Sequence, residues 1–200
     1  MADALTEEIL TFWLGATDDQ WSVDPGTARS WFTKSDDFDG TIRTRFGGHV
    51  EAAAKGDYDH WTETARGRLA LLLLLDQFTR NIYRDTAKAW AADDKSLAIA
   101  CQGIELGHDQ ELRPIERPFM YLPLEHAEDM AMQDHCVELC RVLGEQAPED
   151  AVFCNAIHGY AIRHRDIVAR FGRFPHRNVF LGRESTAEEV EFLTKPGSSF

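Results

Sequence analysis

Apolar residues recur at helical spacing along most of this chain, whereas the alternation that marks β-strands is scarce. Between residues 37 and 55 an apolar side chain falls on every fourth position, from Phe38 to Val50. A second predicted helix, 63–84, contains the unbroken apolar run Leu69–Leu75. A helix that is apolar on all sides belongs inside a helical layer. The pattern therefore predicts an all-α fold.

Glycine, proline and capping residues separate the remaining helical segments. We expect further helices at about 5–14, 27–33, 86–106, 123–143, 148–171 and 185–193. Because long helices alternate with short connections, we expect antiparallel helical hairpins in one domain over 1–200, with a tail at 194–200.

The composition is that of a globular protein, with 44% hydrophobic and 28% charged residues among 200. A formal net charge of −13 argues against general binding to nucleic acid or to an anionic membrane. The longest apolar run is far shorter than the roughly 20 residues that span a bilayer. The acidic N-terminus does not resemble a signal peptide, and the four cysteines are expected to be reduced thiols, so we predict a cytoplasmic protein.

Arginine is concentrated near the end of the chain. Six arginines, one aspartate and no lysine lie between Arg163 and Arg183. Guanidinium groups pair bidentately with carboxylate or phosphate and tolerate partial burial. The segment therefore indicates either internal ion pairs with the excess acids or an anion-binding site.

A second group of charges follows the apolar run. Asp76, Arg80 and Arg84 are spaced four residues apart, which predicts that they share one helical face and pair along it. Asp76 is expected to be partly desolvated, so that it needs Arg80 as a partner. Structural pairing is favoured over catalysis here.

The predicted helix 123–143 opens with acidic residues and a histidine. Glu125, Glu128 and Asp129 would share one face, where they complement the helix dipole, accept arginine or, less favoured, hold a divalent cation. His164 falls on the apolar stripe of helix 148–171 and is expected to face the core. It is either a satisfied core histidine or an acid–base residue oriented by Glu125 or Glu128.

Three strings of residues, at 74–81, 121–129 and 170–178, resemble motifs of the bacterial family called domain of unknown function 924. The resemblance extends over about 5–193 and implies an all-helical fold similar to the tetratricopeptide-repeat-like superhelix. It implies no activity. Two positions depart from the pattern, since Ala127 stands where serine is expected and Thr79 where proline is common.

We predict from these residues a protein that binds an anionic small molecule in a pocket lined by arginine, histidine and glutamate, whether or not it is an enzyme. The alternatives are a module that binds an acidic peptide and a buried arginine–carboxylate network with a structural role. We predict no cofactor, no metal and no nucleic-acid or membrane partner, and the oligomeric state is left open. The candidate ligand-binding residues are Asp76, Arg80, Asn81, Arg84, Arg173, His176, Arg177 and Asn178, and the candidate catalytic residues are Glu125, His126, Glu128 and His164.

Overall fold

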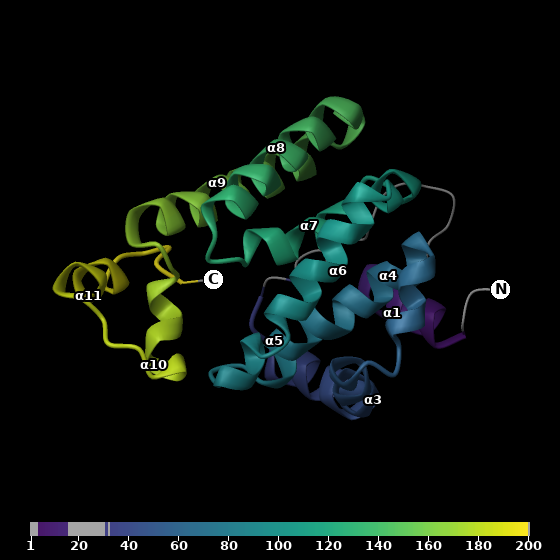
Figure 1. The fold of residues 1–200 in the computed structure, drawn as a ribbon, viewed down its shortest axis with the longest axis horizontal. Helices are drawn as coiled ribbons and strands as arrows, with labels where there is room; N and C mark the ends of the chain where they lie inside the picture. Colours follow the sequence, from purple (N-terminus) through teal and green to yellow (C-terminus); the bar gives the residue numbers. More distant parts are fainter. Residues whose placement is uncertain (1–3, 16–30, 32, 200) are drawn as a thin grey trace. The chain divides into compact units, whose positions relative to one another are not determined.

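The computed structural model describes residues 4–15, 31 and 33–199. Within these ranges every regular element is a helix, which confirms the all-α prediction (Figure 1). The chain forms two compact units, the first made of residues 1–84 and 88–123 and the second of residues 85–87 and 124–200. The single-domain and tetratricopeptide-like arrangements stay predictions.

The first unit contains most of the short helices. In chain order its helices are α1 (Ala4–Leu14), α3 (Asp36–Lys55), η1 (Asp59–Glu63), α4 (Ala65–Leu72), η2 (Leu73–Phe78), α5 (Thr79–Ile82), η3 (Ala87–Trp90), α6 (Asp93–Glu105), η4 (His108–Glu111) and α7 (Arg117–Glu125), in which the chain passes to the second unit.

The apolar run lies at the centre of the first unit, as its sequence predicts. Every side chain from Leu69 to Leu75 is completely buried. Aromatic rings from three helices pack near it, including Trp13 of α1, Phe46 of α3 and Phe78 of η2. Burial of one such leucine contributes about 1.5–3 kcal/mol, so this run is a large part of the apolar burial that stabilises the unit.

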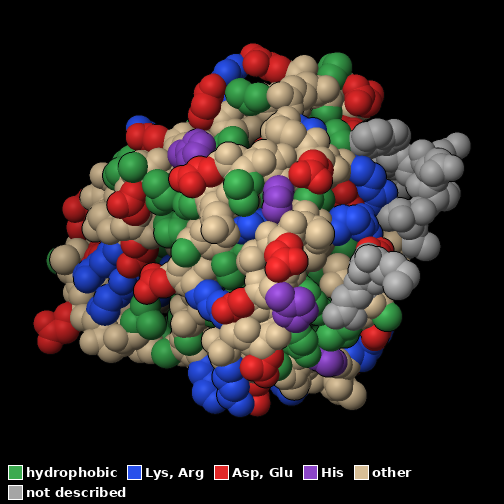
Figure 2. All heavy atoms as spheres, turned by 45° about the vertical axis from the view of Figure 1, so that its right-hand side comes forward, with side chains coloured by type: hydrophobic (Ala, Val, Ile, Leu, Met, Phe, Trp, Pro, Cys, Tyr) green, Lys and Arg blue, Asp and Glu red, His purple; other side chains and the backbone are tan. Residues whose placement is uncertain are grey.

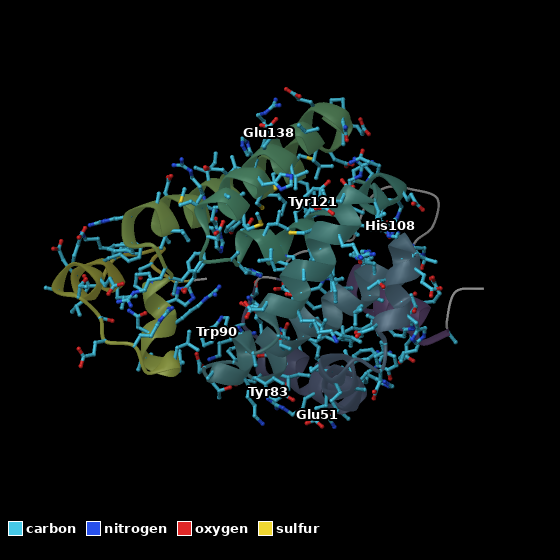
Figure 3. The ribbon with its side chains drawn as sticks, viewed as in Figure 1. Glu51, Tyr83, Trp90, His108, Tyr121 and Glu138 are labelled. Carbon is cyan, nitrogen blue, oxygen red and sulfur yellow. The ribbon has the colours of Figure 1, made fainter. Side chains whose placement is uncertain are left out.

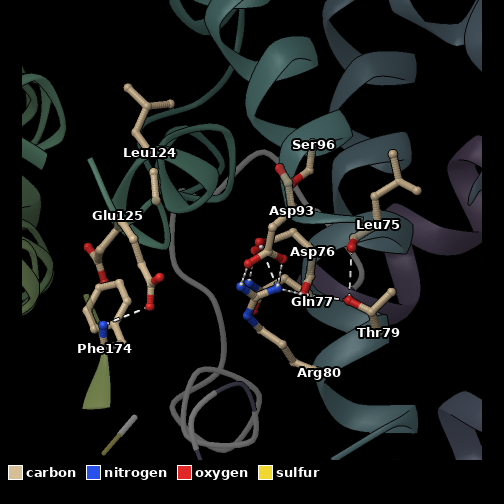
Figure 4. Close-up of polar contacts among 12 residues, drawn as sticks. Leu75, Asp76, Gln77, Thr79, Arg80, Asp93, Ser96, Leu124, Glu125 and Phe174 are labelled. Carbon is tan, nitrogen blue, oxygen red and sulfur yellow. Dashed lines mark hydrogen bonds and ion pairs between the residues drawn. The ribbon is translucent and has the colours of Figure 1, made fainter. Parts of the chain in front are cut away.

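The predicted helix 63–84 is not a uniform α-helix. Residues Leu73–Phe78 form a π-helical turn, η2, between α4 and α5. The hydroxyl of Thr79 bonds to the carbonyl oxygens of Leu75 at 2.8 Å and Asp76 at 3.1 Å, and so provides a donor where the backbone bonding pattern changes (Figure 4).

Other helix boundaries also differ from the prediction. The segment 86–106 splits into η3 and α6. Pro123 does not open a helix but lies near the end of α7, which stops at Glu125, and α8 begins only at Met130. The reason is local, because Asp129 takes extended backbone and its side chain caps the new helix by accepting the N–H of Met132 at 3.0 Å. Within the predicted helix 27–33 the structure describes Trp31 and Thr33 alone, so this helix stays a prediction.

The second unit is built on an antiparallel pair of long helices, which lie side by side in Figure 1. Its helices are α8 (Met130–Gln146), η5 (Pro148–Asp150), α9 (Ala151–Phe171), η6 (Pro175–Arg177), α10 (Asn178–Leu181) and α11 (Ala187–Leu193). Helix α9 ends at Gly172, whose φ of +69° is a left-handed conformation that suits glycine. Thr186 and Glu189 form a capping box at the start of α11.

Charged side chains of both signs are mixed over the face that Figure 2 shows. Among the described helices, none has the length and apolar character needed to cross a membrane.

Candidate functional site

The candidate residues fall into two groups, one in each compact unit. Asp76, Arg80, Asn81 and Arg84 belong to the first unit. The others belong to the second unit and are Glu125, His126, Glu128, His164, Arg173, His176, Arg177 and Asn178.

In the first unit, Arg80 lies between two carboxylates (Figure 4). Its Nη1 is 3.0 Å from Asp76 Oδ1, and its Nη1 and Nη2 donate to the two oxygens of Asp93 at 3.0 Å each. Asp76 is 1% exposed and also accepts the side-chain N–H of Gln77 at 2.6 Å. Burial alone lowers the pKa of Arg80, but Asp76 and Asp93 raise it above its ordinary value. The predicted Asp76–Arg80 pair is confirmed.

Arg84 does not lie on the same helical face as Asp76 and Arg80, so that part of the prediction is wrong. Helix α5 ends at Ile82, so Arg84 lies beyond the helix. Its guanidinium binds Asp39 of α3, with Nε at 2.9 Å and Nη2 at 3.1 Å from the two oxygens. Asn81 donates to the same carboxylate at 2.7 Å. Asp39, which sequence reasoning missed, therefore joins α3 to α5.

In the second unit, two arginines are held by buried or half-buried glutamates. Arg183 donates to Glu128 at 2.6 and 3.0 Å, and Arg173 donates to Glu189 at 2.7 and 2.8 Å. We call these two ion pairs the brace pairs. Asn178 joins them, since its Oδ1 accepts Arg183 Nε at 2.9 Å and its Nδ2 lies 3.4 Å from Glu189 Oε2.

The brace pairs favour the charged form of their glutamates. Burial raises the pKa of Glu128, but hydrogen bonds from Arg183 and from the backbone N–H of Phe174 bring it below its ordinary value. The hydrogen bond from Arg173 lowers the pKa of Glu189 to about 2. Both glutamates are therefore ionised acceptors at neutral pH.

The three acidic residues at 125–129 do not share a helical face. Glu125 ends α7, Glu128 lies in the connection and Asp129 caps α8. Across the described ranges, no group of three or more histidine, cysteine, aspartate or glutamate side chains is arranged to hold a metal ion.

His164 faces the interior, as predicted, and Glu125 is its carboxylate neighbour. Its Nδ1 lies 2.9 Å from the carbonyl oxygen of Tyr160 and 3.1 Å from Glu125 Oε1, and the two side chains are 6% and 5% exposed. Because a carbonyl oxygen can only accept, Nδ1 carries the hydrogen and Nε2 carries the lone pair of the neutral ring. Burial first, and then His126, Arg177 and His176, lower the pKa of His164 to about 3.

The ring of Phe174 is the centre of this group. Phe174 is completely buried, and ring centroids lie 5.6 Å away for His164 and 5.9 Å away for His176. The guanidinium carbon of Arg177 lies over the same ring, 4.5 Å from its centroid. The ring of His126 lies 6.1 Å from that of His164. We call Glu125, His126, His164, Phe174, His176 and Arg177 the Phe174 cluster.

Sequence reasoning found every polar member of the Phe174 cluster but not its aromatic centre. Phe174 stands between two candidate residues in the sequence, Arg173 and His176. An aromatic residue next to a helix end usually packs in a core, and nothing in its spacing distinguished this one. Arg183 and Glu189, which complete the brace pairs, were also missed as site residues.

Comparison with known proteins identifies relatives but no activity. Residues 9–197 match the family described as "Bacterial protein of unknown function (DUF924)". A solved structure of a protein of unknown function from Agrobacterium tumefaciens is 42% identical, with a TM-score of 0.81 over 95% of this chain and 97% of the other. A search of curated proteins gives no match.

Proposed function

This chain belongs to the DUF924 family of bacterial proteins of unknown function, and we propose that it binds a small anion, a phosphate or a carboxylate, at the Phe174 cluster. The observation that carries the proposal is the gathering of one guanidinium and two imidazole rings about a single buried aromatic ring, with a third imidazole beside one of the two. Guanidinium and imidazole groups are the side chains that bind phosphate and carboxylate most readily.

The position of Arg177 supports this role. It is 6% exposed, and its contact with Phe174 is a cation–π interaction that fixes where the charge lies. A buried, fixed guanidinium loses little side-chain freedom when an anion binds, which favours affinity.

His164 is the candidate acid–base residue of the cluster. Its Nδ1 lies beside Glu125 Oε1 and the carbonyl of Tyr160, and a carboxylate neighbour of this kind orients an imidazole for acid–base work. Glu125 is then a positioning residue, since it acts on a ligand through His164.

The candidate arginines outside the Phe174 cluster are proposed to have a structural role, because they form ion pairs within the protein. Arg173, Arg80 and Arg84 each bind a carboxylate of this same chain, through two hydrogen bonds in every case. The proposed ligand-binding residues are those that gather at Phe174, namely His126, His164, His176 and Arg177. Binding of an acidic peptide stays a prediction.

The test is a thermal-shift and calorimetry screen with phosphate, sulfate, acetate and citrate. We expect at least one of these anions to raise the melting temperature of the wild-type protein, and Arg177→Gln to abolish the rise. Arg163→Gln is the matched control, because Arg163 also lies over an aromatic ring, Tyr160 at 4.1 Å, but on the exposed side of α9.

Two results would overturn the proposal. One is the absence of any shift with the wild-type protein across the screen. The other is an anion-induced shift that Arg177→Gln and Arg163→Gln retain equally. If Arg177→Gln does not fold, Arg177→Lys keeps the charge but loses the planar fork, and we expect it to weaken the shift while the protein stays folded.

A further inference from the structure

We propose that the buried guanidinium of Arg68 is a second binding site, which takes a small carboxylate in the place that the side-chain amide of Gln102 fills. This site lies in the first unit and does not depend on the anion binding proposed at the Phe174 cluster. It follows from the groups that accept the hydrogen bonds of Arg68 and from the exposure of one of them.

Arg68 of α4 is a buried cation without a carboxylate partner among the described residues. Its side chain is 1% exposed. Its Nε donates to His108 Nδ1 at 3.2 Å, its Nη1 to the carbonyl oxygen of Ile99 at 2.6 Å and its Nη2 to that of Thr62 at 2.7 Å. Gln102 Oε1 accepts from Nη1 at 3.1 Å and from Nη2 at 3.2 Å. Every one of these acceptors is a neutral atom.

Arg66, two residues earlier on the same helix, shows how the protein holds a different arginine. Its guanidinium donates to Glu7 at 2.7 and 3.0 Å and to Glu116 at 3.3 Å. The hydrogen bond with Glu7 raises the pKa of Arg66, whereas burial lowers the pKa of Arg68. A buried charge without an opposite charge beside it is unfavourable, so a carboxylate next to Arg68 would be stabilised.

Gln102 is the acceptor that a ligand can replace. Thr62 and Ile99 contribute backbone carbonyl oxygens, whose positions the fold determines. The side chain of Gln102, in contrast, is on an exposed residue of α6 and can turn into water, where its amide is hydrated. That rotation would uncover Nη1 and Nη2, a pair of nitrogens that binds the two oxygens of a carboxylate side by side.

A carboxylate matches the shape of the amide that it would displace. Both groups are planar, but the carboxylate oxygens share a negative charge, and hydrogen bonds between ionised groups are about twice as strong as neutral ones. The Arg68 side chain is packed closely under α6, where a Cβ at Gly103 would lie 2.4 Å from Arg68 Cδ. We therefore expect a small planar carboxylate to bind in preference to the bulkier, tetrahedral phosphate.

Exchange of Gln102 for glutamate tests whether Arg68 lacks a negative partner. Gln102→Glu offers a carboxylate of the same shape to the same two nitrogens, and we expect the melting temperature to rise by about 2–4 °C. The control is Asn155→Asp, which also replaces an amide by a carboxylate at an exposed helical position, on α9 in the second unit. We expect a smaller change there, as for most surface substitutions.

Titration with acetate measures ligand binding at the site itself. The backbone amide NMR signals of residues 99–108 report on this site separately from the Phe174 cluster. Gln102→Ala removes the competing amide, and we expect it to bind acetate up to about tenfold more tightly than the wild-type protein. Gln102→Glu should show no saturable shift of these signals, because its own carboxylate occupies the site. Phosphate, titrated in parallel, should bind more weakly than acetate.

The outcomes separate this inference from the proposed function. Either of two results overturns the inference: a Gln102→Glu protein that is no more stable than the wild type, or a Gln102→Ala protein whose signals at 99–108 do not respond to acetate. Equal acetate affinity in Gln102→Ala and Gln102→Glu also overturns it. Phosphate that binds as tightly as acetate overturns the choice of a carboxylate. Failure of anion binding at the Phe174 cluster changes none of these measurements.

Discussion

We predict that the substitution Gly103→Ala in α6 destabilises the protein, although alanine is the best helix former. The cause is Arg68, whose side chain passes beside Gly103 and is 1% exposed. The guanidinium is held by neutral acceptors only, in the part of the chain that the structure describes. These are the carbonyl oxygens of Thr62 and Ile99, Gln102 Oε1 and Nδ1 of His108, which Figure 3 labels.

The size of the effect follows from the distances at Gly103. A Cβ atom there would lie 2.4 Å from Arg68 Cδ, 3.0 Å from Arg68 Nε and 3.3 Å from Met120 Sδ. Carbon atoms normally approach to about 3.5–4.0 Å, so Arg68 must move by roughly 1 Å. Overpacking of this kind costs about 1–3 kcal/mol, and weakening a charged hydrogen bond adds about 1–3 kcal/mol. Against a helix-propensity gain of about 0.5–1 kcal/mol, we expect a net loss of about 1–5 kcal/mol.

The assay is urea and thermal unfolding followed by tryptophan fluorescence, because the four tryptophans that the structure describes, Trp13, Trp31, Trp61 and Trp90, belong to the first unit. Gly103→Ala should lower the melting temperature by roughly 10 °C. The control is Gly48→Ala in the exposed part of α3, where a Cβ would meet no atom within 4 Å, and which should stabilise by about 0.5–1 kcal/mol.

If Gly103→Ala and Gly48→Ala have the same free energy of unfolding, the reasoning is refuted. That result would show that the Arg68 side chain moves aside at no cost in stability. A double-mutant cycle gives a second check. In the Arg68→Ala background the obstructing Cδ is gone, so Gly103→Ala should no longer destabilise, and the coupling energy should match the predicted loss.

Two further predictions concern the second unit. The pKa of His164 is about 3 in the folded protein and near 6.5 when unfolded, so the unfolded chain binds one more proton between these values. Stability should therefore fall as pH falls through that window, by up to about 1.4 kcal/mol per pH unit, and His164→Gln should flatten this dependence in urea titrations. Separately, Glu128→Gln should lower the unfolding free energy by about 2–3 kcal/mol, because Arg183 and the N–H of Phe174 lose a charged acceptor. Calorimetry should show no such loss for Glu138→Gln, whose carboxylate is exposed on α8.

Much of the fold could be predicted because it depends on local signals. The apolar run Leu69–Leu75 predicts a buried helix without knowledge of its neighbours, and Gly56 and Gly172 end helices that the spacing had already indicated. The connection at 125–130 could not be predicted in this way. Both a helix start at Pro123 and a cap at Asp129 fit local rules, so the sequence alone did not show that the helix begins after Asp129.

The candidate site was predictable in its residue types but not in its pairs. The spacing of Asp76 and Arg80 within one helix predicts their contact, because neighbours at four residues meet on any helical surface. The contacts of Arg84 with Asp39 and of Arg183 with Glu128 join residues that are far apart in the sequence. A single sequence holds no signal for such pairs, and so it could not show which arginines are engaged by the protein itself.

Residues Leu73–Phe78 form a π-helical turn. The number of residues in this segment therefore matters as much for the contacts that follow it as the types of those residues. Each residue of an α-helix turns the chain by roughly 100°, so loss of one leucine would rotate everything that follows on the helix. Arg80 would then leave Asp93, and Asn81 would leave Asp39, although no side chain of either pair had been altered. Exchanges among the leucines of this segment should be tolerated far better than a deletion of any one of them.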